Sequence, residues 1–284
     1  MLFLIDFFRF EFQNIFLNNK ELTRLWPLYL ILLLSGLFFY IDDIKNLNPQ
    51  SKLSFQFISS FVLISSINLP LFGFPLKIEF LFAMLLIIYS ANVFNFIDGF
   101  DGMFSLSIFF TLLGINLQIY QDPNFQYIFL INNLLILFLI PYAIMNKTKK
   151  YKIFLGDSGA VSIGILLAWE ILIFINTQYF FNIIFFFLYP LSDVTLTLLK
   201  KIMNKKNLFA RDFDYFFLKP IKIYSKTHSY VFRQFLNFYI IQFIIINLFT
   251  KTNYYPIILF ILINNFWMIY RLQKGLNYIP SWRK

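Results

Sequence analysis

The chain has 284 residues, of which 59% are hydrophobic and only 13% are charged. Soluble domains carry about twice that fraction of charged residues, and the apolar residues here form repeated runs long enough to cross a bilayer as helices. The composition therefore excludes a soluble globular domain and predicts an all-α, polytopic membrane protein. The absence of cysteine excludes disulfides and thiolate metal ligands, and the single histidine excludes a histidine-rich metal site within one chain.

Apolar segments of helix-spanning length follow one another along the chain. We expect about nine transmembrane helices, at residues 25–41, 53–71, 79–97, 102–119, 125–145, 159–176, 178–199, 234–250 and 254–270. Residues 1–24 are apolar but interrupted by charges, so we interpret them as an interfacial segment without the features of a cleaved signal peptide. No polar linker divides the chain, so we predict one membrane-embedded domain over residues 1–284, with a large basic cytoplasmic loop at 200–233.

The distribution of lysine and arginine predicts the orientation of the chain. If residues 42–52 face the cytoplasm and the spans alternate, 19 of the 24 Lys and Arg residues fall in cytoplasmic segments and five fall outside. The net charge of +10 then follows from this bias, so we predict no nucleic-acid partner. The same cytoplasmic segments contain seven aspartates: Asp42, Asp43, Asp98, Asp101, Asp157, Asp212 and Asp214. Because carboxylates beside hydrocarbon do not stabilise a membrane protein, we interpret them as candidates for binding a divalent cation and a phosphate substrate.

The first motif is a pair of aspartates, Asp42 and Asp43, at the inner end of the first span, followed by Lys45 and Lys52. The pair can bind a cation or form ion pairs with these lysines. The alternative is that it only solvates the end of a helix.

The second motif lies at the inner end of the third apolar segment. Four polar residues recur there at every third position: Asn92, Asn95, Asp98 and Asp101. Because residues three apart lie near one face of a helix, the first three are expected to form a polar stripe. Gly99 and Gly102 allow the backbone to turn and to approach a ligand closely. A simple Asp-Gly turn would explain the glycines but not the two asparagines one turn earlier, so we favour a functional site.

The third motif is Phe154-Leu-Gly156-Asp157-Ser-Gly, preceded by Asn146 and four lysines. A carboxylate between glycines at the start of an apolar helix can be an N-cap. It can also be a metal ligand beside a backbone that binds phosphate.

Together, the three motifs resemble the polyprenyl-phosphate N-acetylhexosamine-1-phosphate transferases (glycosyltransferase family 4). That superfamily includes undecaprenyl-phosphate N-acetylglucosamine-1-phosphate transferases and phospho-N-acetylmuramoyl-pentapeptide transferases, and the resemblance covers roughly residues 30–235. It implies transfer of a sugar-1-phosphate from a UDP-sugar to undecaprenyl phosphate, with release of UMP and with Mg²⁺, which Mn²⁺ can replace. It also implies a multi-pass protein of the bacterial inner membrane with a cytoplasmic active site, acting first in the synthesis of a cell-envelope polysaccharide such as O-antigen, and it is compatible with a homodimer.

The resemblance also implies roles for individual residues. Asp157 matches the magnesium ligand, with Asp98 as its expected companion, and the Asp42-Asp43 pair matches carboxylates near the phosphates; these four are the candidate catalytic residues. Asn95 and Asp98 match residues around the diphosphate, and Asp101 matches the uridine end of the pocket. The candidate substrate-binding residues are Lys52, Asn92, Asn95, Gly99, Asp101, Asn146, Phe154, Arg211 and Asp214.

The chain departs from the family pattern in two places. Family members usually have ten or more spans, with one before the aspartate pair, whereas about 25 residues precede the first clear span here. Their large inner loop usually carries a histidine motif, whereas this chain has Arg211 and Asp214 in the matching stretch. We expect Arg211 to neutralise phosphate and Asp214 to bind a cation or a sugar hydroxyl, and we interpret His228 as a solvated loop residue.

Two other functions are compatible with a polytopic chain that contains carboxylates. An ion-coupled secondary transporter would place them in broken helices near the bilayer midplane, whereas here they lie in and beside inner loops. A non-catalytic homologue that binds lipid phosphate would explain the missing histidine motif but not the full set of aspartates.

Overall fold

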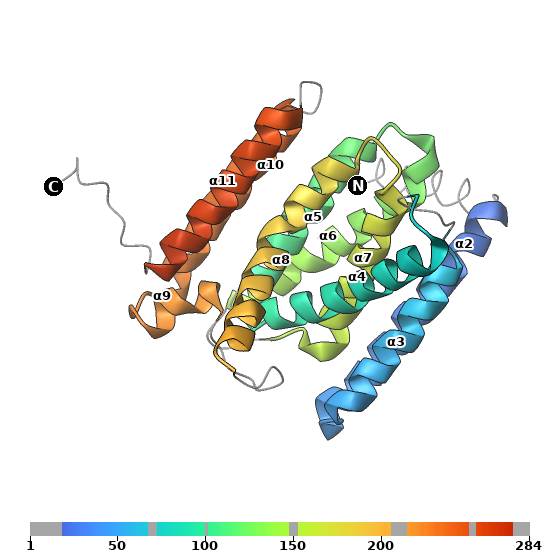
Figure 1. The fold of residues 1–284 in the computed structure, drawn as a ribbon, viewed down its shortest axis with the longest axis horizontal. Helices are drawn as coiled ribbons and strands as arrows, with labels where there is room; N and C mark the ends of the chain where they lie inside the picture. The colour runs from blue at the N-terminus through green and yellow to red at the C-terminus, as the bar shows by residue number, and fades with distance from the viewer. Residues whose placement is uncertain are drawn as a thin grey trace. The chain divides into compact units, whose positions relative to one another are not determined.

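The computed structural model describes residues 19–67, 73–99, 102–147, 153–205, 215–249 and 254–274, which contain helices joined by turns and no strand (Figure 1). Within these described ranges, six helices are long and apolar enough to cross a membrane: Leu25–Lys45, Leu76–Ile97, Pro123–Asn146, Gly156–Phe174, Phe180–Met203 and His228–Leu248. Two shorter apolar helices cover Met103–Ile119 and Ile258–Gln273. The predicted all-α, polytopic membrane fold is therefore confirmed, while the number of spans stays a prediction.

Each predicted apolar segment overlaps one long helix. These helices are α2 (Asn19–Lys45), α3 (Pro49–Ser65), α4 (Leu76–Ile97), α5 (Met103–Ile119), α6 (Gln126–Lys147), α7 (Gly156–Phe174), α8 (Phe180–Met203), α10 (His228–Phe249) and α11 (Tyr254–Gln273). Short helices η1 (Pro123–Phe125), η2 (Phe216–Leu218) and α9 (Lys219–Lys222) lie between them. Several helices extend past the apolar runs because backbone hydrogen bonding continues into polar residues. Thus α8 reaches Met203 and α10 already begins at His228, within the predicted loop.

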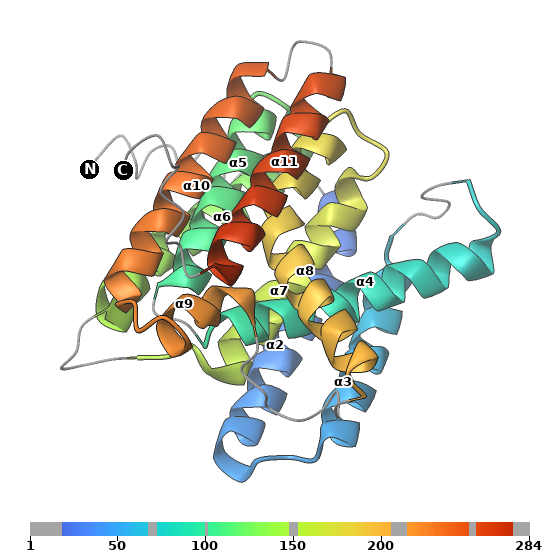
Figure 2. The ribbon, with the colours of Figure 1, turned by 60° about the vertical axis from the view of Figure 1, so that its left-hand side comes forward.

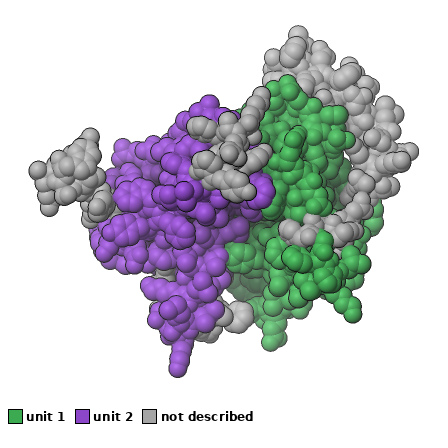
Figure 3. Space-filling model, turned by 45° about the horizontal axis from the view of Figure 1, so that its top comes forward, with its two compact units in different colours: residues 1–95, 115–137, 155–180 green, residues 96–114, 138–154, 181–284 purple. Residues whose placement is uncertain are grey.

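The chain forms two compact units, which Figure 3 shows in different colours. Unit 1 comprises Met1–Asn95, Ile115–Leu137 and Leu155–Phe180, and unit 2 comprises Phe96–Gly114, Phe138–Phe154 and Phe181–Lys284. Because α4, α5 and α6 each contribute to both units, the division does not follow the order of the sequence. The prediction of one domain over the whole chain stays a prediction.

Within unit 1, α2 packs along α7. The hydroxyl groups of Ser35 and Ser162 lie 2.7 Å apart across this helix pair. On another face of α7, Gly164 lies so close to α4 that a Cβ atom at this position would be 2.7 Å from the Cα atom of Ala91. Small residues thus let these helix backbones approach closely, as is common in membrane bundles.

Within unit 2, a hydrophobic core joins α8, α10 and α11, with Phe185, Phe186, Ile246 and Ile261 buried at its centre. Asp193 of α8 is also fully buried. Its carboxylate accepts hydrogen bonds from the Tyr189 hydroxyl (2.6 Å) and from the backbone N–H groups of Phe216 (3.0 Å) and Phe217 (3.1 Å). These bonds attach η2 to α8 and satisfy the buried charge.

Candidate active site

Helix α2 presents the aspartate pair at its last turn. The Asp42 side chain is buried, 2% exposed, whereas Asp43 is exposed, because adjacent residues on a helix point in different directions. One carboxylate oxygen of Asp42 accepts the backbone N–H of Leu47 at 2.8 Å. The other oxygen lies 2.5 Å from the Nζ atom of Lys52. Asp42 therefore both orders the chain after α2 and forms an ion pair with α3.

Asp43 caps a different helix of the same unit. Its carboxylate accepts the backbone N–H groups of Asp157 at 3.0 Å and Ser158 at 3.3 Å, at the N-terminus of α7. A carboxylate at this position satisfies free N–H groups and complements the helix dipole. The sequence left open whether Asp157 was itself an N-cap. The structure assigns the capping bonds to Asp43, since α7 begins at Gly156 and Asp157 lies within its first turn.

Gly156 makes this capping contact sterically accessible. Its φ angle is +73°, which favours glycine. A Cβ atom at Gly156 would lie 2.6 Å from a carboxylate oxygen of Asp43. The glycine before Asp157 is thus required both by the backbone conformation and by the approach of α2.

Lys52 of α3 completes this group of charges. Its Nζ atom lies 3.3 Å from the Asp157 carboxylate in addition to its contact with Asp42. One ligand oxygen from each of Asp42, Asp43 and Asp157 lies within 4.8 Å of the others. Three carboxylates at this spacing supply the oxygen ligands that Mg²⁺ prefers, so the donor set fits the predicted metal. We call these three aspartates with Lys52 the carboxylate site.

Two asparagines of α4 border the carboxylate site. The side chain of Asn95 lies close to the Asp157 carboxylate. The Asn92 amide donates to Gln56 of α3 at 2.9 Å and to the carbonyl oxygen of Ile88 at 2.7 Å. Gln56 was not among the candidate residues. Its position four residues after Lys52, on the same face of a helix, is the sequence signal that could have identified it.

A second polar cluster lies in unit 2. The Tyr142 hydroxyl of α6 donates to Asp98 at 2.7 Å. The Asn146 amide accepts the backbone N–H of Gly102 at 2.6 Å and donates to the carbonyl oxygen of Ile153 at 2.8 Å. Asn146 therefore connects Gly102, the residue before α5, to the segment that leads to the third motif. Tyr142, which the sequence analysis missed, lies one helical turn before Asn146.

The structure distributes the predicted residues between these two clusters. Asp42, Asp43, Lys52, Asn92, Asn95 and Asp157 lie in unit 1, whereas Asp98, Gly99, Asn146 and Phe154 lie in unit 2. Phe154 is 49% exposed, and Gly99 is also exposed. The expected pairing of Asp98 with Asp157 at a metal stays a prediction. Asp101, Arg211 and Asp214 lie outside the described residues. The roles expected of Arg211 and Asp214 therefore stay predictions.

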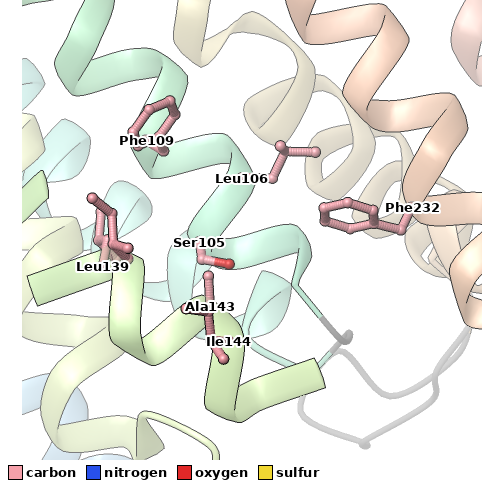
Figure 4. A pocket seen from close by; sticks show the side chains of 8 residues that line it. Ser105, Leu106, Phe109, Leu139, Ala143, Ile144 and Phe232 are labelled. Carbon is pink, nitrogen blue, oxygen red and sulfur yellow. The ribbon is translucent and has the colours of Figure 1, made fainter. Parts of the chain in front are cut away.

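An apolar pocket of about 270 Å³ lies beside the second cluster, within unit 2 (Figure 4). Its lining comes from α5, α6 and α10: Ser105, Leu106, Phe109, Leu139, Ile140, Ala143, Ile144 and Phe232. Ser105 donates to the carbonyl oxygen of Gly102 at 3.1 Å, and Ala143 follows Tyr142 on α6. Helix α6 therefore carries Tyr142 and Asn146 of the polar cluster as well as part of the pocket lining.

The ion pair between Lys52 and Asp42 gives a prediction about stability. Replacing Lys52 by methionine is expected to lower the free energy of unfolding by about 1–3 kcal/mol, because the buried Asp42 carboxylate loses its cation. The double variant with Asp42→Asn should recover part of this loss, because asparagine removes the buried negative charge that Lys52 no longer pairs with. Unfolding of the wild type, both single variants and the double variant measures the coupling energy. A coupling of zero would show that the pair does not stabilise the fold.

Comparison with known proteins gives a family match that contains all three motifs. Residues 25–175 match the family described as glycosyl transferase family 4. The phospho-N-acetylmuramoyl-pentapeptide-transferase of Streptococcus agalactiae serotype Ia is 27% identical over 169 residues, which cover 53% of this chain and 50% of the relative. The protein of the same name from Streptococcus pneumoniae serotype 2 is 29% identical over 181 residues, covering 58% and 53% respectively. The chain thus spans about half the length of the curated relatives that it matches.

Proposed function

Because the chain belongs to glycosyl transferase family 4, we propose that it transfers a sugar-1-phosphate from a UDP-sugar to polyprenyl phosphate and releases UMP. An N-acetylhexosamine-1-phosphate is the proposed group, in a step of cell-envelope polysaccharide synthesis. The observation that carries this proposal is the carboxylate site, where Asp42, Asp43 and Asp157 converge around Lys52. The curated relatives are named for transfer of phospho-N-acetylmuramoyl-pentapeptide, a reaction of the same general kind.

The chemistry of phosphoryl transfer explains why such a site is needed. A UDP-sugar carries two negative charges on its diphosphate, and the lipid phosphate adds about −1.5 to −2 near neutral pH. Asp42, Asp43 and Asp157 would hold Mg²⁺, which when bound neutralises phosphate oxygens. Lys52 offsets the repulsion between Asp42 and Asp157 and supplies a further positive charge for the phosphates. Because the acceptor phosphate is already ionised, the reaction needs positioning and charge neutralisation more than a strong base.

The arrangement in unit 2 supports an amphiphilic acceptor. Tyr142 and Asn146, which form the polar cluster with Asp98, lie on α6, and α6 also lines the apolar pocket (Figure 4). A polyprenyl phosphate has a charged head and a long apolar chain, so it needs both kinds of surface. We propose that the pocket holds the first isoprene units of the acceptor.

The proposed active site faces the cytoplasm of a bacterial inner membrane, which gives a prediction about topology. Reporter domains fused after Lys52, Lys150 and Lys206 are expected to read as cytoplasmic, because 19 of 24 Lys and Arg residues fall in the segments on that side. Reporters fused near Lys77 and Asp122 should read as external and serve as the matched controls. An external signal after Lys150 would contradict the proposed orientation of Asp157.

A direct assay tests the function. Purified full-length protein is incubated with polyprenyl phosphate, MgCl₂ and one UDP-sugar at a time, and release of UMP is measured together with formation of the lipid product. UMP is expected with at least one UDP-N-acetylhexosamine and not without the lipid. Binding of polyprenyl phosphate with no UMP from any donor would instead indicate a non-catalytic homologue. Ion-driven uptake of a solute into liposomes would indicate a transporter.

A further inference from the structure

The C-terminal part of the chain has an unusual distribution of charge. Residues 215–284 contain nine Lys and Arg residues and no Asp or Glu. Six of these cations lie among the described residues, around the end of the α10–α11 hairpin where α10 begins and α11 ends (Figure 2): Lys219, Lys222, Lys226, Arg233, Arg271 and Lys274. We call this region of unit 2 the basic end.

Local contacts hold the segments of the basic end together. Ser225 has a φ angle of +52°, and the turn that it forms brings the backbone N–H of Lys226 to the carbonyl oxygen of Pro220 at 3.0 Å. The Tyr224 hydroxyl donates to the carbonyl oxygen of Gln273 at 3.1 Å, which links this turn to the end of α11. These bonds place α9 and the turn, which carry Lys219, Lys222 and Lys226, beside the end of α11.

Exposed apolar and aromatic side chains accompany these cations. Ile223 is 65% exposed and Trp267 is 42% exposed. Trp267 stacks on Tyr270 with ring centroids 6.2 Å apart, and the guanidinium group of Arg271 lies 5.8 Å from the centre of the Trp267 ring. Among the described residues, the buried Nε atom of Arg271 has no hydrogen-bond partner. Tryptophan and tyrosine beside Lys and Arg are typical of the headgroup level of a bilayer.

We propose that the basic end binds the anionic headgroups of phospholipids in the surrounding bilayer. The positive charge complements an anionic headgroup, the exposed apolar side chains match the adjoining acyl region, and the sequence from residue 215 onward contains no Asp or Glu. A general excess of cytoplasmic Lys and Arg explains the sign of the charge. It does not explain why the cations from three elements are held together beside exposed tryptophan and isoleucine.

Lipid titration of the purified full-length protein tests this proposal. In neutral detergent, added phosphatidylglycerol is expected to raise the Tm, and native mass spectrometry should show it bound, whereas phosphatidylcholine should have neither effect. The triple variant Lys219→Gln, Lys222→Gln, Lys226→Gln should bind phosphatidylglycerol with an apparent affinity lower on the order of 10²-fold, because each Lys near a lipid surface contributes about fivefold. A triple Lys→Arg variant at these positions should bind like the wild type.

A matched control separates this site from the effect of net charge. The variant Lys45→Gln, Lys200→Gln, Lys205→Gln removes three exposed lysines from the ends of α2 and α8, and it should retain the response to phosphatidylglycerol. An equal loss in both Gln variants would overturn the proposal, as would an equal response to phosphatidylcholine. Inorganic phosphate at the same concentration should not raise the Tm. A similar rise would indicate an anion site without lipid recognition and would also overturn the proposal.

Discussion

Replacing Asp157 by asparagine is expected to reduce the rate of UMP release at least about 10²-fold, the scale of losing one main electrostatic stabiliser of a transition state. Asparagine keeps the shape of the side chain but removes the negative charge that faces Lys52 at 3.3 Å and adjoins Asp42 and Asp43. The capping bonds at the start of α7 should survive, because they use the backbone N–H of residue 157 and the side chain of Asp43. The variant should therefore fold and bind lipid while losing turnover.

Two controls make this result specific to the carboxylate site. Asp122→Asn changes an aspartate that caps η1 and accepts a hydrogen bond from Tyr179 at 3.0 Å, and it should leave turnover unchanged. In the wild type, a chelator should abolish activity, MgCl₂ or MnCl₂ should restore it, and MgCl₂ should raise the Tm. That rise should be smaller in Asp157→Asn. Full activity of the variant would exclude Asp157 from the reaction.

Replacing Gly164 by alanine is expected to lower the free energy of unfolding by about 1–3 kcal/mol, the usual effect of overpacking. A Cβ atom there would lie 2.7 Å from the Cα atom of Ala91 and 2.8 Å from the carbonyl oxygen of Ser90. Both are backbone atoms, so α4 and α7 must separate to make room. Because α4 also carries Asn92 and Asn95, turnover should fall as well. Denaturant unfolding in detergent and the UMP assay measure the two effects.

Gly36 provides the matched control for this change. It also lies inside a long helix, α2, but a Cβ atom at Gly36 would meet no other atom within 4 Å. Gly36→Ala should therefore be neutral or should stabilise the protein by up to about 1 kcal/mol, because alanine is the better helix former. If both alanine variants have the same stability, the close approach of α4 to α7 does not limit the packing of unit 1.

Much of the fold could be predicted from local properties of the sequence. Long apolar runs with few charges must form helices in a bilayer, because every backbone polar group there needs an internal partner. For the same reason, each predicted apolar segment overlaps a helix, even where the helix begins or ends at another residue than the apolar run. The family could be predicted as well, because its motifs are short and contiguous, as in Asn92 to Gly102 and Phe154 to Gly159. The C-terminal end of α8 and the N-terminal end of α10 could not be predicted from the apolar runs. Helical hydrogen bonding continues into polar residues, so a helix does not have to end where hydropathy falls.

The sequence by itself determined the membrane class, the family and the identity of the acidic motifs. Composition and the spacing of neighbouring residues are properties of the linear chain and do not depend on how it folds. Only the tertiary structure decided what these residues contact. Asp43 caps α7, Lys52 joins Asp42 to Asp157, and Gln56 pairs with Asn92, and each contact links residues at least 10 positions apart. Such contacts depend on how α2, α3, α4 and α7 pack together. That packing follows from close approaches such as those at Gly156 and Gly164, which no local pattern in the sequence specifies.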